Sequence, residues 1–244
     1  MGYAPAITGR QSPLAPDYPA AVPGLMAFVA GYVDVTTFLA FNGLFVAQAT
    51  GSLVVAGAAL ETGPITFVKV AAIPVFFLAG IATTTLVRGF GPDKSRALAA
   101  ALLGEALIIG GMVLAALLSR DITPAPLLGL AAMGVQSALA RLLLTGYGST
   151  NVMTSNITQF SIDLETAIAG YFRGTPAPEA WRSAERVGAI LGSFALGVIA
   201  GGIGYRILGM NGLLLMVSTL CALAAWIAAD GRRLNRLGKG GQNA

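Results

Sequence analysis

The sequence predicts an all-α membrane protein with six full transmembrane helices and two re-entrant half-helices, arranged as two inverted-topology repeats. Three observations lead to this prediction: the composition, a weak internal repeat and the placement of the basic residues. Of the 244 residues, 55% are apolar and only 11% are charged. Because a helix needs about 20 mostly apolar residues to cross a bilayer, the chain has room for roughly six to eight spans and almost no soluble domain.

The composition also excludes several classes of function. The chain has no histidine and one cysteine, Cys221, which lies in an apolar run. His/Cys metal sites, Ser-His triads and disulfide frameworks are therefore excluded, and we expect no metal, no cofactor and no enzymatic activity. The formal charge is +4, but the basic residues lie at the ends of apolar segments, where they orient a membrane protein. We therefore expect the partner to be the lipid bilayer and not a nucleic acid.

Eight apolar stretches follow a proline-containing segment, residues 1–21, which we interpret as a disordered or surface-lying tail. The second and sixth stretches are short or weakly apolar and rich in polar residues, and they follow the breaks at Asn42-Gly43 and Gly146-Tyr147-Gly148. They look like interrupted elements. The stretches span residues 22–41, 44–60, 65–87, 97–118, 125–144, 150–170, 187–208 and 211–229.

Self-comparison indicates two related halves. Gly31-Tyr-Val-Asp precedes Thr50-Gly-Ser, and Gly134-Val-Gln-Ser precedes Thr154-Ser-Asn at a similar spacing. The next spans then align at one constant offset, with Phe77 against Phe194. We expect a first repeat at residues 22–120, a second at 121–230 that carries an extra polar loop at 173–186, and a basic cytoplasmic tail at 231–244.

The basic residues predict how the two halves are oriented, since Lys and Arg in short loops prefer the cytoplasm. Clusters at residues 88–96, 173–186 and 232–239 should all lie inside, yet the repeat pairs two of them with nearly uncharged loops. Equivalent loops therefore face opposite sides, which requires an odd number of crossings in each half. The interrupted second element of each half then becomes the re-entrant segment, and both termini lie in the cytoplasm.

Paired broken segments in inverted repeats are the best sequence indication of a transporter's central site, because half-helix N-termini present free N–H groups at mid-depth. Gln136 and Ser137 lie at a similar depth on the fifth stretch. Together with the two helix starts they form a predicted binding site for a small polar or anionic solute. The alternative is that these residues cap two ordinary short helices in an eight-span bundle. The predicted substrate-binding residues are Thr50, Gly51, Ser52, Gln136, Ser137, Thr154, Ser155 and Asn156.

Two acids lie near the middle of apolar stretches, Asp34 in residues 22–41 and Glu105 in residues 97–118. An acid at that depth is costly and normally faces a cavity or a partner. We therefore consider both as proton-coupling residues. The alternative is that each carboxyl group bonds a buried polar group and holds helices together.

Several of these elements resemble the YoaK family of bacterial inner-membrane proteins, a domain of unknown function. The resemblance rests on Gly31-Tyr-Val-Asp with the following Thr-Phe-Leu-Ala, on Leu44-Phe-Val with Thr50-Gly, and on Ala132-Met-Gly-Val-Gln, and it covers about residues 22–230. It implies a multi-pass protein of the bacterial inner membrane, and it supplies no substrate. This chain departs from the family at Ser52 and at Ser155-Asn156.

Three functions remain. We favour a small secondary transporter, with a channel-like pore and a non-transporting membrane sensor or scaffold as alternatives. The glycines at 188, 192, 197 and 201 form small-residue pairs that allow close helix packing. We expect this packing to lie within the subunit, and a homodimer is the alternative.

Overall fold

The computed structural model describes residues 18–62, 67–118, 124–144, 147, 149–150 and 153–240, of which residues 56, 59, 60, 62 and 231–240 are described by their backbone alone. Within these residues the chain forms eight α-helices and one 3₁₀ helix, and contains no strand. The helices are α1 (Ala21–Ala40), α2 (Ala49–Thr62), α3 (Phe67–Gly89), α4 (Lys94–Leu118), α5 (Pro124–Leu143), α6 (Met153–Phe172), α7 (Pro178–Leu208), η1 (Gly209–Gly212) and α8 (Leu213–Gly240).

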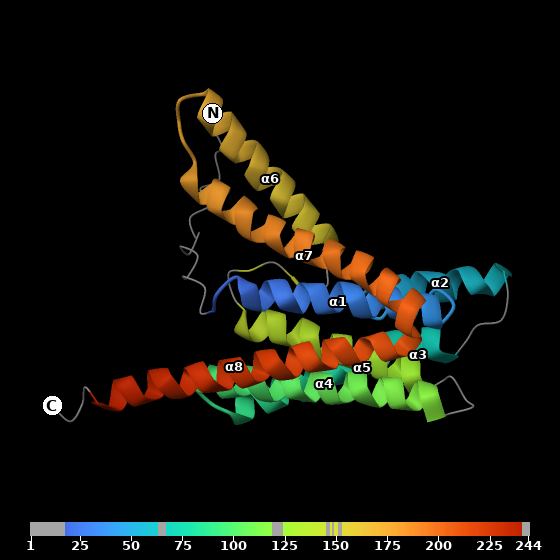
Figure 1. The fold of residues 1–244 in the computed structure, drawn as a ribbon. Coiled ribbons are helices and arrows are strands. Elements are labelled where there is room, and N and C mark those ends of the chain that lie inside the picture. The colour runs from blue at the N-terminus through green and yellow to red at the C-terminus, as the bar shows by residue number, and fades with distance from the viewer. Residues whose placement is uncertain are drawn as a thin grey trace, which may run out of the picture.

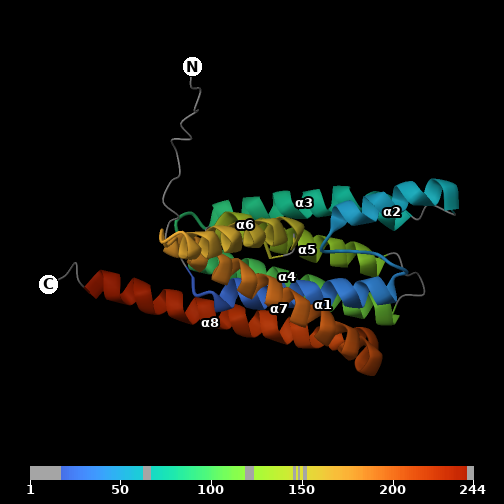
Figure 2. The same ribbon diagram turned by 90° about the horizontal axis from the view of Figure 1, so that it is seen from above.

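Six helices traverse the molecule in alternating directions, namely α1, α3, α4, α5, α7 and α8 (Figures 1 and 2). The chain reverses at η1, so that α8 returns along α4 whereas α7 lies against α1. Helix α6 packs beside α7, which leans away from the rest of the bundle in Figure 1. The start of α1 and the end of α8 lie at the same end of the bundle.

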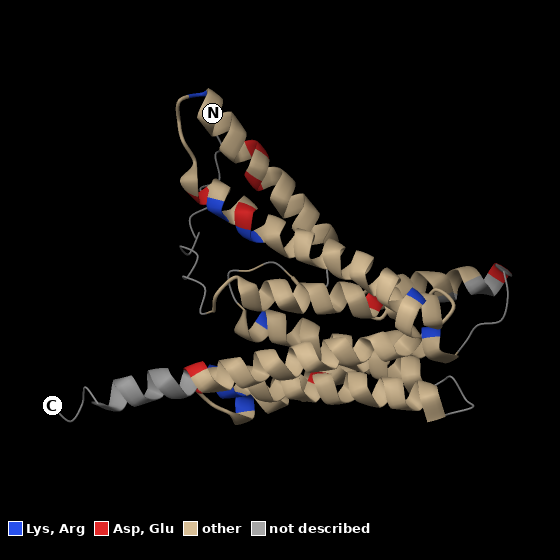
Figure 3. Ribbon diagram, in the orientation of Figure 1, with Lys and Arg blue, Asp and Glu red and all other residues tan. Residues whose placement is uncertain are grey.

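Five stretches are long and apolar enough to cross a membrane: Ala21–Ala40, Phe67–Gly89, Lys94–Leu118, Pro124–Leu143 and Pro178–Asp230. The last one contains α7, η1 and most of α8. Figure 3 shows that Lys, Arg, Asp and Glu gather near the helix ends, while long helical stretches carry almost none. Composition and helices together indicate a multi-pass membrane protein.

Burial distinguishes central from peripheral helices. In α1 67% of the most apolar stretch is buried inside the structure, against 17% in α3. Helix α1 is therefore a central element of the bundle, whereas α3 turns large side chains such as Phe77 and Leu78 outwards, as a lipid-facing helix does.

One predicted loop is wrong. The predicted polar loop at residues 173–186 is helical from Pro178 onwards, because Pro178 occupies the first helical turn with Glu179 beside it, both of which favour a helix start. Hydropathy misses this turn because it carries charges. Helix α2 begins at Ala49, next to the helix N-terminus predicted at Thr50, and residues 44–48 of the second apolar stretch lie in non-helical backbone.

Three of the four glycines singled out in α7 pack within the subunit, whereas a Cβ atom on Gly192 would meet nothing within 4 Å. Gly197 and Gly201 lie against the backbone of Phe28 and Tyr32 in α1, and Gly188 lies against the ring of Phe160 in α6. Parts of other predictions lie outside the described residues: the tail at 1–17, the centre of the repeat boundary at 119–123 and the last four residues of the basic tail.

Candidate functional site

The chain breaks sharply after α1, at the predicted Asn42-Gly43 step. Both residues adopt positive φ, 51° at Asn42 and 82° at Gly43, a conformation that Asn and Gly tolerate best. The following segment is held by Asp34 of α1, whose Oδ1 atom accepts hydrogen bonds from the backbone N–H groups of Val46 and Ala47, both at 2.9 Å. The buried Asp34 carboxylate therefore fixes the chain that leads into α2.

The segment before α6 is anchored in a related way by an amide. Gln136 of α5, fully buried, donates from Nε2 to the Thr150 hydroxyl at 3.2 Å and to the carbonyl oxygen of Met26 in α1 at 2.7 Å. Asn156, in the first turn of α6, exchanges hydrogen bonds with the backbone N–H and carbonyl of Ser149. In each half of the chain, a buried polar side chain of one helix thus holds the segment that precedes the next helix. Helix α2 has 14 residues, but α6 has 20, as many as α5, so the prediction of a half-length helix fits α2 and not α6.

The first turns of α2 and α6 line a common cavity of about 370 Å³. Helix α2 leaves this region towards one end of the bundle and α6 leaves it in roughly the opposite direction (Figures 1 and 2). The first N–H groups of a helix have no acceptor within it, and the N-terminus carries a partial positive charge. The lining residues are Ala47, Gln48, Ala49, Thr50, Ile73, Phe76, Phe77, Ser137 and Thr154.

The cavity brings together three of the predicted binding residues, Thr50, Ser137 and Thr154, from α2, α5 and α6. Gln48, which lines the same cavity, was not among the predicted site residues. Its polar side chain directly before a predicted helix start was the available signal, and the same residue lies at the boundary with a second cavity.

The other predicted binding residues do not line this cavity. The Ser52 hydroxyl donates to the carbonyl oxygen of Phe45 at 2.7 Å, and Gly51 lies beside the Phe45 ring. Ser155 is exposed on the first turn of α6, while Gln136 and Asn156 are buried and make the anchoring bonds described above. Ser52, Gln136 and Asn156 therefore hold the segments at the two helix starts and do not line the cavity between them.

The two predicted proton-coupling acids have different surroundings. Asp34 is 5% exposed and lines a cavity of about 200 Å³ together with Gln48, so one residue borders both the acid's cavity and the central one. Glu105 is fully buried in α4, and neither of its carboxyl oxygens has a hydrogen-bond partner among the described residues. A buried carboxyl group without partners is costly and is normally retained for function.

Comparison with protein families gives a match over residues 23–227 to the family described as "Protein of unknown function (DUF1275)". The chain belongs to this family. Membership is consistent with the resemblance to YoaK-like membrane proteins, and it assigns no chemistry to the site. Comparison with curated proteins and with solved structures gives no match.

Proposed function

We propose that this DUF1275 member is a secondary transporter for a small polar or anionic solute, which binds in the cavity between the starts of α2 and α6. One observation carries the proposal: Thr50 of α2 and Thr154 of α6, two helices that run in roughly opposite directions, line the same cavity as Ser137. Two helix N-termini that meet at one cavity present their positive dipole ends to an anion or a polar group. In α2 the N–H groups of Gly51 and Ser52 already donate to the carbonyl oxygen of Gln48, so the dipole and the side chains at the cavity carry the attraction.

The helix pairings support two inverted repeats, α1–α4 and α5–α8. In the proposed repeat, α1 packs on α7 as α5 packs on α3, and α2 packs on α3 as α6 packs on α7. The close contacts correspond as well, because Gly31 of α1 meets the backbone of Phe194 and Gly134 of α5 meets the backbone of Phe76. Gly31 and Gly134 are equivalent in the sequence repeat. Phe194 is equivalent to Phe77, which is the residue next to Phe76.

We further propose that α1, α3, α4, α5, α7 and α8 cross the bilayer and that α2 and α6 are re-entrant. The reversal of the chain at η1, where Gly209 has a positive φ of 58°, supports treating α7 and α8 as separate spans. Four basic residues, Arg88, Lys94, Arg96 and Arg141, lie at or near the termini of α3, α4 and α5. Under the positive-inside rule, the end of the bundle that carries these basic residues faces the cytoplasm. Both chain termini lie on the same side, and the membrane is a bacterial inner membrane.

Glu105 is the better candidate for proton coupling. Met112, about two turns further along α4, lies against Gly129 of α5. Because α4 and α5 are antiparallel, Gln136, about two turns beyond Gly129, lies at the level of Glu105. The Oε1 atom of Gln136 also lacks a partner among the described residues. The Glu105 carboxyl group and the Gln136 amide oxygen can therefore bind a proton, a water molecule or a solute at the same level of the bundle.

Asp34 has a second role in this proposal. Its carboxylate holds the segment that enters α2, so protonation of Asp34 would weaken two charge-assisted hydrogen bonds to Val46 and Ala47. A proton on Asp34 would then loosen the start of α2 beside the cavity. Movement of one repeat against the other would complete alternating access. We propose no covalent chemistry and no enzymatic role for these residues.

The test is solute flux in proteoliposomes with a pH-sensitive dye inside, using chloride, formate, acetate, phosphate, sulfate and glycine as probes. A transporter should accumulate one class of probe against its gradient when a pH gradient is imposed. Thr50→Trp and Thr154→Trp should abolish that flux, whereas Thr158→Trp, one turn further along α6 and exposed, should retain it. Flux without accumulation would favour a pore, and a complete lack of flux for all probes would favour a sensor or scaffold.

A further inference from the structure

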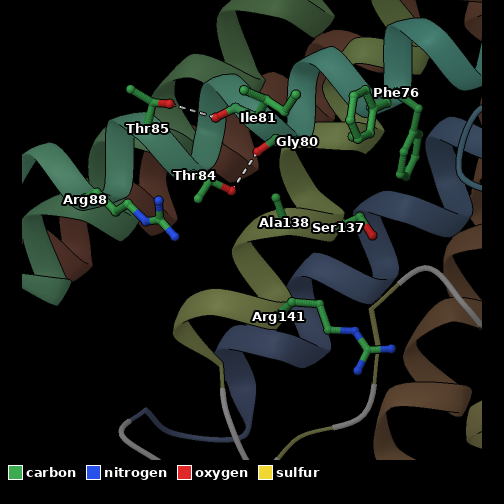
Figure 4. A pocket seen from close by; sticks show the side chains of 11 residues that line it. Phe76, Gly80, Ile81, Thr84, Thr85, Arg88, Ser137, Ala138 and Arg141 are labelled. Carbon is green, nitrogen blue, oxygen red and sulfur yellow. Dashed lines mark hydrogen bonds between the residues drawn. The ribbon is translucent and has the colours of Figure 1, made fainter.

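A third cavity, a groove, lies between α3 and α5, on the side of the bundle where α3 is exposed. It has a volume of about 530 Å³ and is lined by Phe76, Phe77, Gly80, Ile81, Thr84, Thr85 and Arg88 from α3 and by Gly134, Ser137, Ala138 and Arg141 from α5. Figure 4 shows Arg88 on the α3 wall and Arg141 on the α5 wall. Phe77 is 63% exposed, so the groove opens sideways towards the surrounding bilayer.

The groove exists because α3 and α5 separate beyond their closest contact. The helices touch where Gly134 meets the backbone of Phe76, but one turn further along α3 a Cβ atom on Gly80 would meet nothing within 4 Å. In the other pair of helices, Gly197, which aligns with Gly80 in the sequence repeat, packs directly on the backbone of Phe28. A position that is filled by helix contact in one half is therefore left open in the other.

The groove is apolar along its body and cationic at one end. The hydroxyl groups of Thr84 and Thr85 donate to the carbonyl oxygens of Gly80 and Ile81 in their own helix, so they offer little to a ligand (Figure 4). Neither Arg88 nor Arg141 forms a hydrogen bond or an ion pair with another described residue. Two uncompensated guanidinium groups at the end of an apolar, laterally open groove match a molecule with an anionic head and a hydrocarbon tail.

We propose that this groove binds an anionic phospholipid, with its headgroup between the two walls that carry Arg88 and Arg141 and an acyl chain along Phe76, Phe77 and Gly80. A free anion would be drawn to the two arginines, but it would leave the apolar body of the groove unfilled. Phe76, Phe77 and Ser137 line both this groove and the central cavity. The bound lipid thus covers the central cavity on its α3 side.

The test uses the full-length protein in detergent, with phosphatidylglycerol, phosphatidylcholine and inorganic phosphate as separate probes. Native mass spectrometry counts retained lipid, and thermal unfolding reports stabilisation. Phosphatidylglycerol should bind and raise the Tm, whereas phosphatidylcholine and phosphate should have little effect. The double variant R88Q/R141Q should bind phosphatidylglycerol about tenfold or more weakly, since each basic residue near a lipid surface contributes about 1 kcal/mol.

Two further variants separate the site from general effects of charge or folding. R206Q removes an exposed arginine from the last turn of α7 and should bind phosphatidylglycerol as the wild type does. G80W fills the groove while keeping both arginines, and it should weaken lipid retention even if R88Q/R141Q proves too unstable to purify. Equal binding of both lipids, full binding by G80W, or stabilisation by phosphate alone would overturn the proposal.

Discussion

Gly31 of α1 packs directly on the carbonyl oxygen of Phe194 in α7, with no room between them for a side chain. The equivalent contact in the other half joins Gly134 of α5 to Phe76 of α3, where a Cβ atom would lie 2.7 Å from the carbonyl oxygen. Both contacts are backbone against backbone, so neither helix can yield by rotating a side chain. These two glycines therefore set how closely α1 approaches α7 and how closely α5 approaches α3.

Substitution of either glycine should separate the helices and destabilise the protein. We expect Gly31→Ala and Gly134→Ala each to lower the free energy of unfolding by about 1–3 kcal/mol, the usual cost of overpacking a tight interior. Gly192→Ala is the matched control, since a Cβ atom there would meet nothing within 4 Å. Thermal unfolding of the purified variants measures the difference. Equal Tm values for all three would contradict the contact.

The Asp34 anchor predicts that an acceptor oxygen, and not the charge, maintains the fold before α2. Asp34→Asn keeps an oxygen for the N–H groups of Val46 and Ala47, so its stability should stay within about 1 kcal/mol of the wild type. Asp34→Ala leaves both buried donors unpaired, and each should cost about 1–3 kcal/mol. Thermal unfolding and amide hydrogen exchange at Val46 and Ala47 would measure both effects. If Asp34→Asn keeps its stability but transports without a response to pH, a coupling role is separated from the structural one.

Glu105 should behave in the opposite way, because it has no partner to lose. Replacement of an unpartnered buried carboxyl group by an apolar side chain of similar size, as in Glu105→Met, should leave stability unchanged or raise it by about 1–3 kcal/mol. The same variant should lose any dependence of solute uptake on the pH gradient. Glu61→Gln, at an exposed position near the end of α2, is the control for loss of an acid. A strongly destabilised Glu105→Met would instead indicate that the carboxyl group holds the core together.

The sequence predicts the order and type of the helices well, because apolar runs of about 20 residues leave few alternatives. The break in the chain at Asn42-Gly43 was also predictable from the sequence, since both residues tolerate positive φ. The start of α7 was not, because Pro178 and the charged residues after it form a helix that extends beyond the apolar run. Hydropathy predicts which part of a helix can lie in lipid, but it does not predict how far the helix extends beyond the apolar stretch.

The candidate site was predictable as a region but not as a set of side chains. Polar residues beside a helix start can face a cavity, as Thr50 does, or turn back to cap their own loop, as Ser52 does. Sequence cannot distinguish the two, because the choice depends on rotamers and on which neighbouring carbonyl lies within reach. Gln136 shows the same limit, since its amide bonds to Met26 and Thr150 instead of lining the cavity.

The convergence of the α2 and α6 starts is the relationship on which the proposed transport site depends, and it can be tested without knowing the solute. In a Cys221→Ser background, cysteines at positions 50 and 154 should be joined by a short bismaleimide, because both positions line one cavity. The control pair, cysteines at 61 and 154, should stay unlinked, since position 61 lies about 16 Å further along α2 at 1.5 Å per residue. Mass spectrometry of the digested protein identifies the linked peptides. Linkage of the control pair alone would mean that the two helix starts face away from each other, and the central site would then have no basis.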